Sequence, residues 1–125
     1  MDLDKYKYFN LQKENSVVEI QINRPEKKNA FNPEMVYELC NIWEIIESDS
    51  NIKLGILRSV SKDFFSAGAD LKELIPLLTG DLKPKSKYES DLLEDKLLDK
   101  FYRKDKTYLK PIIGYASGYC LAGGF

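Results

Sequence analysis

The order of the hydrophobic patterns along the chain is the strongest constraint on its fold. Apolar and polar residues alternate over residues 18–22, the two-residue period of a half-buried strand, and the segment before them predicts a partner strand across a turn at Glu14-Asn15. Two short apolar runs, residues 52–59 and 111–118, suit buried strands. Helical patterns separate these strands. This order predicts an α/β fold in which at least part of the sheet is parallel.

Three helices are expected. The first runs from the N-cap Asn32, with proline at its first position, to about Glu47. The apolar residues on one side of this helix are Met35, Val36, Leu39, Trp43 and Ile46, which we expect in the core. The other two helices are expected over residues 71–78 and 88–109, on either side of a polar surface loop.

Composition bounds the chain to one domain, residues 1–125, and excludes several classes of function. Nineteen basic and twenty acidic residues leave no basic surplus for nucleic acid. No apolar run approaches the roughly 20 residues that span a bilayer, and the amino end lacks a secretory h-region, so we expect a cytoplasmic protein with reduced cysteines. The chain has no histidine, which excludes His-based triads and His metal sites, and we expect no metal.

Two segments of small residues are the candidates for a chemical role. Ala67, Gly68 and Ala69 follow an expected strand and precede an expected helix, and Gly123 lies in a similar segment after the last strand. Backbone N–H groups at a strand-to-helix turn can bind an oxyanion, because the first N–H groups of a helix have no internal partner. The alternative is that these residues serve tight turns and close packing. Their spacing does not show whether the two turns converge.

Three stretches together resemble a known family. "INRPEKKNAFN", "FFSAGADLKEL" and "KPIIGYASGYCLAGGF" look like successive signatures of the crotonase superfamily, the enoyl-CoA hydratase/isomerase group, from about Val17 onward. The resemblance implies a crotonase-like ββα spiral core that is incomplete at its carboxyl end. It also implies a coenzyme A thioester as substrate, with no separate cofactor. The thioester oxygen would be bound by the N–H groups of Ala69 and Gly123.

The same resemblance implies further binding residues. Lys28, Asn29 and Ala30 would run beside the CoA moiety, although a lysine in a polar loop is more often only solvated. The second segment would line the CoA and acyl groups with Ala67, Gly68, Asp70, Leu71 and Lys72. From the residues alone, Asp70 either caps a helix or contacts a ligand, Glu73 is expected on a solvated helix face, and Cys120 is expected to be a buried, inert thiol.

The resemblance also bears on activity. In the hydratases of this family the first catalytic glutamate would come directly after Phe125 and the second further on, so the chain alone is expected to be nearly inactive. The other half of such a protein supplies the contacts of a homo-oligomer, a trimer or hexamer, and without it we expect exposed core surface and self-association. Double-bond isomerisation, C–C cleavage, decarboxylation, thioester hydrolysis and a non-catalytic truncated product remain alternatives.

Overall fold

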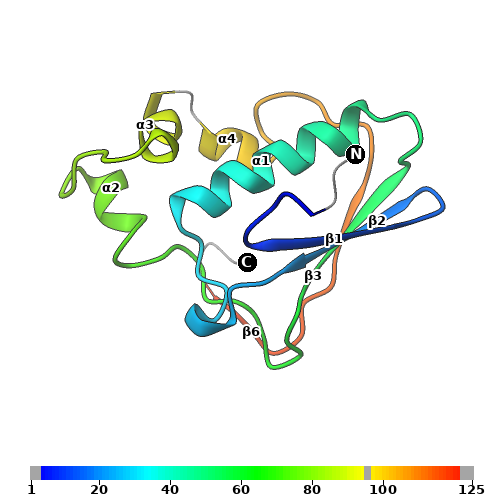
Figure 1. The fold of residues 1–125 in the computed structure, drawn as a ribbon, viewed down its shortest axis with the longest axis horizontal. Helices are drawn as coiled ribbons and strands as arrows, with labels where there is room; N and C mark the ends of the chain where they lie inside the picture. Colours follow the sequence, from blue (N-terminus) through cyan, green and yellow to red (C-terminus); the bar gives the residue numbers. More distant parts are fainter. Residues whose placement is uncertain (1–3, 95–96, 122–125) are drawn as a thin grey trace.

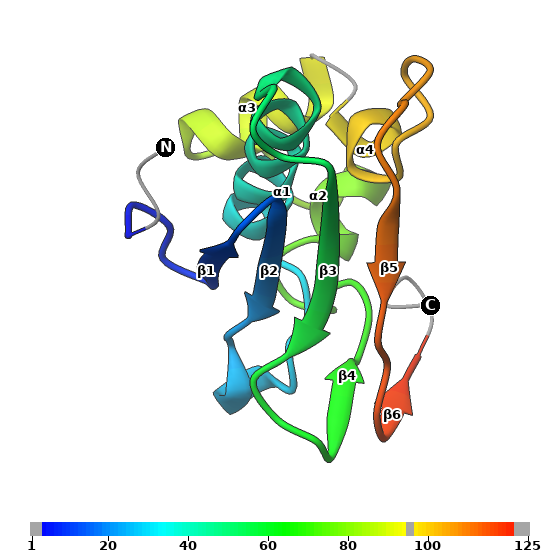
Figure 2. The same cartoon turned by 90° about the vertical axis from the view of Figure 1, so that its right-hand side faces the viewer.

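A mixed sheet forms the base of the fold. The computed structural model describes residues 4–94 and 97–121, and its larger sheet has the strand order β1-β2-β3-β5 (Figure 2). β1 (Phe9–Glu14) pairs antiparallel with β2 (Val17–Ile22) across the predicted turn, where Asn15 has a φ of 55°. β2 and β5 (Ile112–Gly114) both pair in parallel with β3 (Leu54–Ser59). The predicted α/β order and the parallel part of the sheet are confirmed, although β5 is shorter than residues 111–118.

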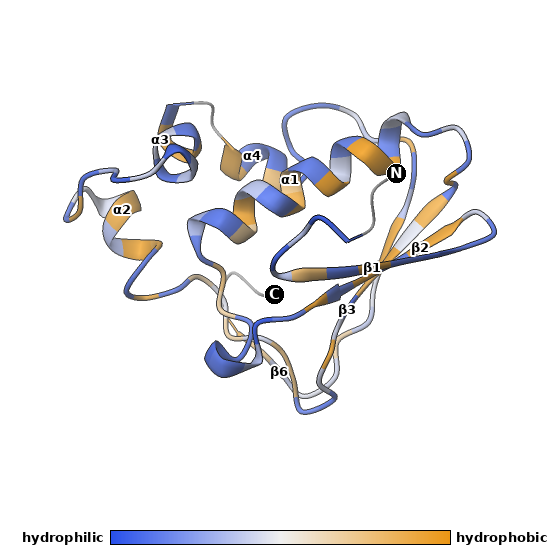
Figure 3. Ribbon diagram, in the orientation of Figure 1, coloured by the Kyte–Doolittle hydropathy of each residue, from blue (hydrophilic) through white to orange (hydrophobic). Residues whose placement is uncertain are grey.

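Helix α1 (Pro33–Ser48) packs on one face of this sheet (Figure 1). The Asn32 side chain accepts a hydrogen bond from the Met35 N–H at 2.8 Å, so the predicted N-cap is confirmed. Apolar and polar bands alternate along the helix (Figure 3). All five residues expected in the core are buried, and the Trp43 indole N–H donates to the Phe101 carbonyl at 3.0 Å.

The helices after β3 differ from the sequence prediction. α2 (Ile75–Thr79) begins four residues later than expected and ends at Gly80, which has a left-handed φ of 87°. The helix expected over residues 88–109 is too long, because the last helical residue is Phe101: α3 (Lys87–Glu94) and α4 (Leu97–Phe101) lie on either side of two residues outside the described ranges, and no helix follows α4 up to residue 109. Among the described residues, no helix has the length and apolar character to cross a membrane.

A Schellman motif explains why α4 ends early. Arg103 adopts a left-handed φ of 58°, its N–H donates to the Lys100 carbonyl, and the Lys104 N–H donates to the Asp99 carbonyl at 2.7 Å. Glycine usually occupies this position, because a side chain disfavours positive φ. The sequence therefore carried no stop signal where an arginine takes this conformation.

The segment after α4 is attached to the end of α1. The Glu47 carboxylate accepts hydrogen bonds from the N–H groups of Leu109 and Lys110, at 2.7 and 3.3 Å. The Lys110 ammonium donates to the carbonyl oxygens of Ile46 and Asp49, which lie at the carboxyl end of α1. A cation there satisfies carbonyls that have no partner within the helix. These contacts fix where β5 begins.

Candidate active site

A second, two-stranded sheet pairs the strands that precede the two segments of small residues. β4 (Phe64–Ser66) and β6 (Tyr119–Cys120) pair in parallel and lie side by side in Figure 2. The Leu121 N–H donates to the Ser66 carbonyl at 3.0 Å, so the pairing continues past β6. Because the pairing is parallel, Ser66, which precedes the first segment, and Leu121, which precedes the second, lie at the same end of this sheet. Gly123 itself lies outside the described residues.

Gly118 makes this pairing possible. Its φ is +74°, and a Cβ at this position would lie 1.9 Å from the Asp63 carbonyl oxygen and 2.9 Å from the Phe64 nitrogen. Real Cβ atoms essentially never approach other atoms within 3.0 Å. Glycine is therefore required where the chain enters β6, both by its backbone conformation and by the close approach of β4.

The direction of the Ala69 N–H follows from the hydrogen bonds around it. Phe31 and Ala69 form a parallel bridge in which the Phe31 N–H donates to the Gly68 carbonyl at 2.7 Å and the Asp70 N–H donates to the Phe31 carbonyl at 2.9 Å. In a trans peptide the N–H points opposite to the C=O of the same unit. Because the Gly68 carbonyl points toward Phe31, the Ala69 N–H faces the other way, out of this pairing.

The prediction that Ala69 lies at the N-terminus of a helix is wrong. α2 begins only at Ile75, and Asp70 uses the N–H groups before it. The Asp70 carboxylate accepts from the N–H groups of Lys72 and Glu73 at 2.8 and 2.9 Å, and its carbonyl accepts from that of Ile75 at 3.0 Å. Ala69 thus presents its N–H from an extended segment. The Asp70 carboxylate caps the turn over residues 71–74 and not α2, whose N-cap is Leu74 without a side-chain hydrogen bond, so the helix-capping interpretation is wrong.

The first loop packs directly against this segment. Lys28 and Asn29 have left-handed φ values of 49° and 57°, and the Lys28 carbonyl accepts from the Ala67 N–H at 3.0 Å. The Asn29 side chain is fully buried and donates to the Ser59 hydroxyl and the Phe65 carbonyl, at 2.7 and 2.9 Å. Asn29 therefore positions the loop from the interior, since the whole residue is buried and its main-chain N–H and C=O are hydrogen-bonded to Arg24 and Ser66.

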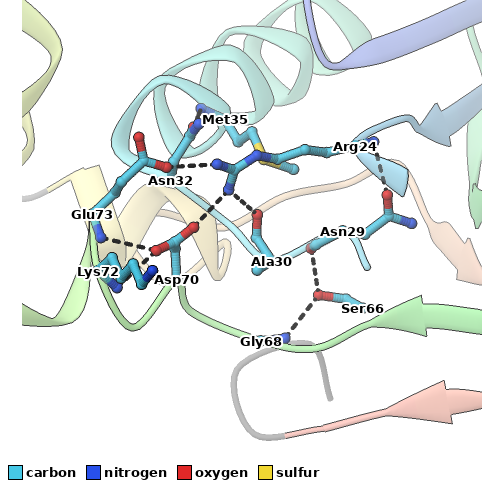
Figure 4. Close-up of polar contacts among 10 residues, drawn as sticks. All are labelled: Arg24, Asn29, Ala30, Asn32, Met35, Ser66, Gly68, Asp70, Lys72 and Glu73. Atoms are coloured by element: carbon cyan, nitrogen blue, oxygen red, sulfur yellow. Dashed lines mark hydrogen bonds and ion pairs between the residues drawn. The ribbon is translucent and has the colours of Figure 1, made fainter. Parts of the chain in front are cut away.

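Ser66 also links the first loop, at Asn29, to the segment over residues 67–69. Its hydroxyl donates to the Asn29 carbonyl at 2.9 Å and accepts from the Gly68 N–H at 3.0 Å (Figure 4). Gly68 has a φ of 95°, which only glycine adopts without strain. The small residues therefore do serve a tight, closely packed turn. The same turn directs one peptide N–H outward.

Arg24 is the residue of this site that the sequence analysis missed. One nitrogen, Nη1, donates to the Ala30 carbonyl and to the Asp70 carboxylate, both at 2.8 Å, and Nη2 donates to the Glu73 carboxylate at 2.6 Å (Figure 4). Glu73 is exposed as expected, but it lies in the turn before α2 and not on a helix, and its carboxylate is ion-paired with Arg24. Arg24 stands in the quoted first motif, but no sequence signal ties it to a carboxylate 46 positions later.

The Asp70 carboxyl group remains ionised in spite of its burial. Burial by itself would raise its pKa, but the hydrogen bonds from the Glu73 and Lys72 amides and from Arg24 outweigh this effect. The pKa of Asp70 is therefore held below its ordinary value. Asp70 thus serves as a charged structural group in this site, and the proton uptake needed by a general base would cost its three hydrogen bonds.

The remaining predicted residues differ in accessibility. Ala30, Ala67 and Ala69 are half-buried, Gly68 is buried, and Leu71 and Lys72 are exposed, with Leu71 80% accessible. The Lys28 side chain is exposed, and its ammonium lies 5.9 Å from the centre of the Tyr119 ring. Cys120 is only half-buried, so the prediction of a buried thiol is wrong in extent. The buried thiol is Cys40, whose pKa burial raises to about 12.

Two largely apolar cavities share part of their lining, and Ala69 borders the smaller one. The smaller has a volume of about 260 Å³ and is lined by Ala69 together with Phe31, Val36, Leu74, Ile75, Leu98 and other apolar residues. The larger, about 490 Å³, lies against α1, β3 and β5 and includes Cys120. Both share Phe31, Phe101 and Tyr102, whose rings meet edge to face with centroids 5.1 and 4.8 Å apart. An apolar group beside Ala69 would enter the smaller cavity.

This chain is similar in sequence to known proteins over most of its length. A mitochondrial Delta(3,5)-Delta(2,4)-dienoyl-CoA isomerase of Dictyostelium discoideum is 32% identical over 129 aligned residues, 99% of this chain and 43% of its own length. A short-chain-enoyl-CoA hydratase of Clostridium acetobutylicum is 30% identical and is matched over 40% of its length. The chain thus spans less than half the length of these curated relatives.

Solved structures share the fold. A probable enoyl-CoA hydratase from Mycobacterium smegmatis is 31% identical, with a TM-score of 0.71 over 94% of this chain and 43% of its own. An enoyl-CoA hydratase from Shewanella pealeana, 23% identical, has a TM-score of 0.76 over 98% of this chain. These likenesses confirm the crotonase-like fold. The sequence profile described as enoyl-CoA hydratase/isomerase matches residues 12–125, and the chain therefore belongs to the enoyl-CoA hydratase/isomerase family.

Proposed function

We propose that this chain binds an acyl-CoA thioester and stabilises negative charge on the thioester oxygen in a hydratase or isomerase reaction. The oxygen would accept hydrogen bonds from the N–H groups of Ala69 and Gly123. The parallel pairing of β4 with β6 carries this proposal, because the two strands that precede the proposed donors finish at the same end of one small sheet. The outward direction of the Ala69 N–H supports it.

The chemistry of the substrate explains why a fixed amide is useful. Proton transfer or hydration next to a thioester passes through an enolate-like state in which negative charge develops on the oxygen. A donor that is already oriented toward this oxygen stabilises the transition state more than the ground state. Loss of one such donor typically costs about 2.7–4 kcal/mol of activation free energy. The hydrogen bond between Phe31 and Gly68 supplies the orientation in advance.

The surroundings of Ala69 suit the two ends of such a substrate. We propose that the acyl group enters the cavity of about 260 Å³, because its lining is almost entirely apolar. The CoA portion would lie over the exposed side, where Lys28 and Lys72 can meet its phosphates. None of the described residues that line this cavity is charged, which favours a hydrocarbon over a polar acyl group.

Proton transfer requires groups in addition to these amides. Asp70 and Glu73 are both ion-paired with Arg24, and these pairs make either carboxylate a poor acid or base. We propose that proton transfer depends on the glutamates that the family resemblance places after Phe125. Acid–base groups typically contribute about 10²–10⁴-fold in rate. The 125-residue chain is therefore expected to bind a thioester without rapid turnover.

A spectroscopic titration tests the proposal. The ¹⁵N-labelled chain is titrated with a short saturated acyl-CoA and, separately, with the thioether in which CH₂ replaces the carbonyl. The Ala69 amide proton should move downfield with the thioester only, because a hydrogen bond to the oxygen deshields it. Ala69→Gly should keep this thioester-specific shift of the amide at position 69, and Ala69→Val should remove it. Equal Ala69 shifts with both ligands would reject the proposal.

A further inference from the structure

We propose that Arg24 positions the Ala69 N–H, through a clasp that it forms with Asp70 and Glu73. The inference rests on the proposed function, because it concerns the residue that orients the proposed oxyanion donor. Arg24 does not touch the place where the thioester oxygen would lie. It acts on the two segments whose pairing sets the direction of the Ala69 peptide.

The contacts of the clasp lie on both sides of that peptide. Arg24 Nη1 binds the Ala30 carbonyl, one residue before Phe31, and the carboxylate of Asp70, one residue after Ala69. A single nitrogen thus binds the neighbours of both residues in the Phe31–Ala69 bridge. Figure 4 shows its contacts with Ala30 and Asp70. The Arg24 N–H also donates to the Asn29 side chain at 2.8 Å, which connects the clasp to the buried part of the first loop.

The second arm fixes the other end of the segment. Arg24 Nη2 reaches Glu73 at 2.6 Å, and the Glu73 N–H is itself bound by the Asp70 carboxylate. Residues 70–73 are thus held as one unit against the Arg24 side chain, which is only 7% exposed. A planar guanidinium can serve three acceptors in fixed directions, whereas an ammonium on a flexible chain does not hold the same geometry.

Charge gives the clasp a second effect on the site. Asp70 directly follows the proposed donor, and its carboxylate would repel negative charge that develops on a nearby oxygen. Arg24 lies 2.8 Å from this carboxylate, and both side chains are more than 90% buried. Interactions between buried charges are weakly screened, so the compensation by Arg24 matters more here than at an exposed pair. Removal of Arg24 would therefore loosen the turn and uncover an opposing charge.

The test compares two conservative variants of the ¹⁵N-labelled chain. Arg24→Lys keeps the charge but not the three-way geometry. Arg58→Lys is the matched control, because Arg58 is also ion-paired, with Glu19 at 3.1 Å, and lies on the main sheet. The first readout is hydrogen exchange of the Phe31 amide, which donates to Gly68, relative to the core amide of Ile20. The second is the thioester-specific shift of the Ala69 amide.

For Arg24→Lys we expect the Phe31 amide to exchange about 10- to 100-fold faster relative to Ile20, the effect of losing a charge-assisted hydrogen bond. The thioester-specific shift of Ala69 should fall by more than half, and Arg58→Lys should change neither readout. Unchanged exchange and an unchanged shift in Arg24→Lys would overturn the inference. A general loss of stability would accelerate both amides together and would also count against positioning.

Failure of the proposed function is a separate outcome. If the Ala69 amide of the unmodified chain shows no thioester-specific shift, the function is rejected, and the exchange of Phe31 still decides whether Arg24 orients the peptide. If Arg24→Lys does not fold, Glu73→Gln is used as the test variant. Glu73 is half-exposed, and its substitution removes only the contact with Nη2. That variant should accelerate Phe31 exchange several-fold, and no acceleration would overturn the inference.

Discussion

Replacement of Gly118 by alanine tests the close approach of β4 and β6. The new Cβ would lie 1.9 Å from the Asp63 carbonyl oxygen, about 1.5 Å closer than the 3.4 Å at which ordinary contact begins. The obstructing atoms are backbone, so rotation of a side chain cannot relieve the clash. The chain must separate here, with loss of the hydrogen bonds from Tyr119 to Asp63 and from Leu121 to Ser66.

The cost follows from two contributions. A positive φ costs a non-glycine residue about 1–2 kcal/mol, and two lost backbone hydrogen bonds cost about 0.5–1.5 kcal/mol each. Gly118→Ala should therefore lower the free energy of unfolding by about 2–5 kcal/mol, a large part of the 5–15 kcal/mol typical of a domain. The thioester-specific shift of Ala69 should disappear as well, because β6, the strand that precedes the second segment, separates from β4.

Two other glycines serve as matched controls. Gly80 has a similar φ of +87° but no atom within 4 Å of an added Cβ, so Gly80→Ala isolates the conformational cost of about 1 kcal/mol. Gly114 has neither a positive φ nor a close neighbour, so Gly114→Ala should change little. Urea unfolding followed by the fluorescence of the single tryptophan, Trp43, gives the free energies. Equal losses for Gly118→Ala and Gly80→Ala would refute the steric argument.

Two further variants test the charged contacts. Asp70→Asn should lower the free energy of unfolding at pH 7 by about 3 kcal/mol, because it breaks a buried ion pair. Since the folded pKa of Asp70 is lowered, its contribution is present above its unfolded value near 3.8 and is lost as the pH falls through the folded value. Urea unfolding at pH 7 and pH 3 should show the difference from the unmodified chain shrinking, and a constant difference would contradict this. Lys110→Met should cost about 1–2 kcal/mol, because the last carbonyls of α1 lose their donor. Thermal unfolding followed by circular dichroism would test this, and an equally small effect of Lys110→Met and of the exposed control Lys106→Met would refute the capping role.

The sequence by itself determined the elements with strong local signals. Alternation in β2, the Asn32 N-cap and the apolar stripe of α1 were all confirmed, because each depends on residues that are neighbours in sequence. The family motifs identified the two segments of small residues in the same way. Local chemistry also predicted that Gly80 would end a helix.

Tertiary structure decided how α4 ends and what orients Ala69. Arg103 takes a conformation usually reserved for glycine, which no local pattern announces. The Ala69 N–H owes its direction to Phe31, and Arg24 owes its role to Asp70, contacts between residues 38 and 46 positions apart. The free energy of such contacts depends on burial and on the proximity of segments that are distant in sequence. Neither can be predicted from the local sequence. For that reason the sequence was enough to propose the residues of a site, whereas only the fold showed which way the Ala69 N–H points.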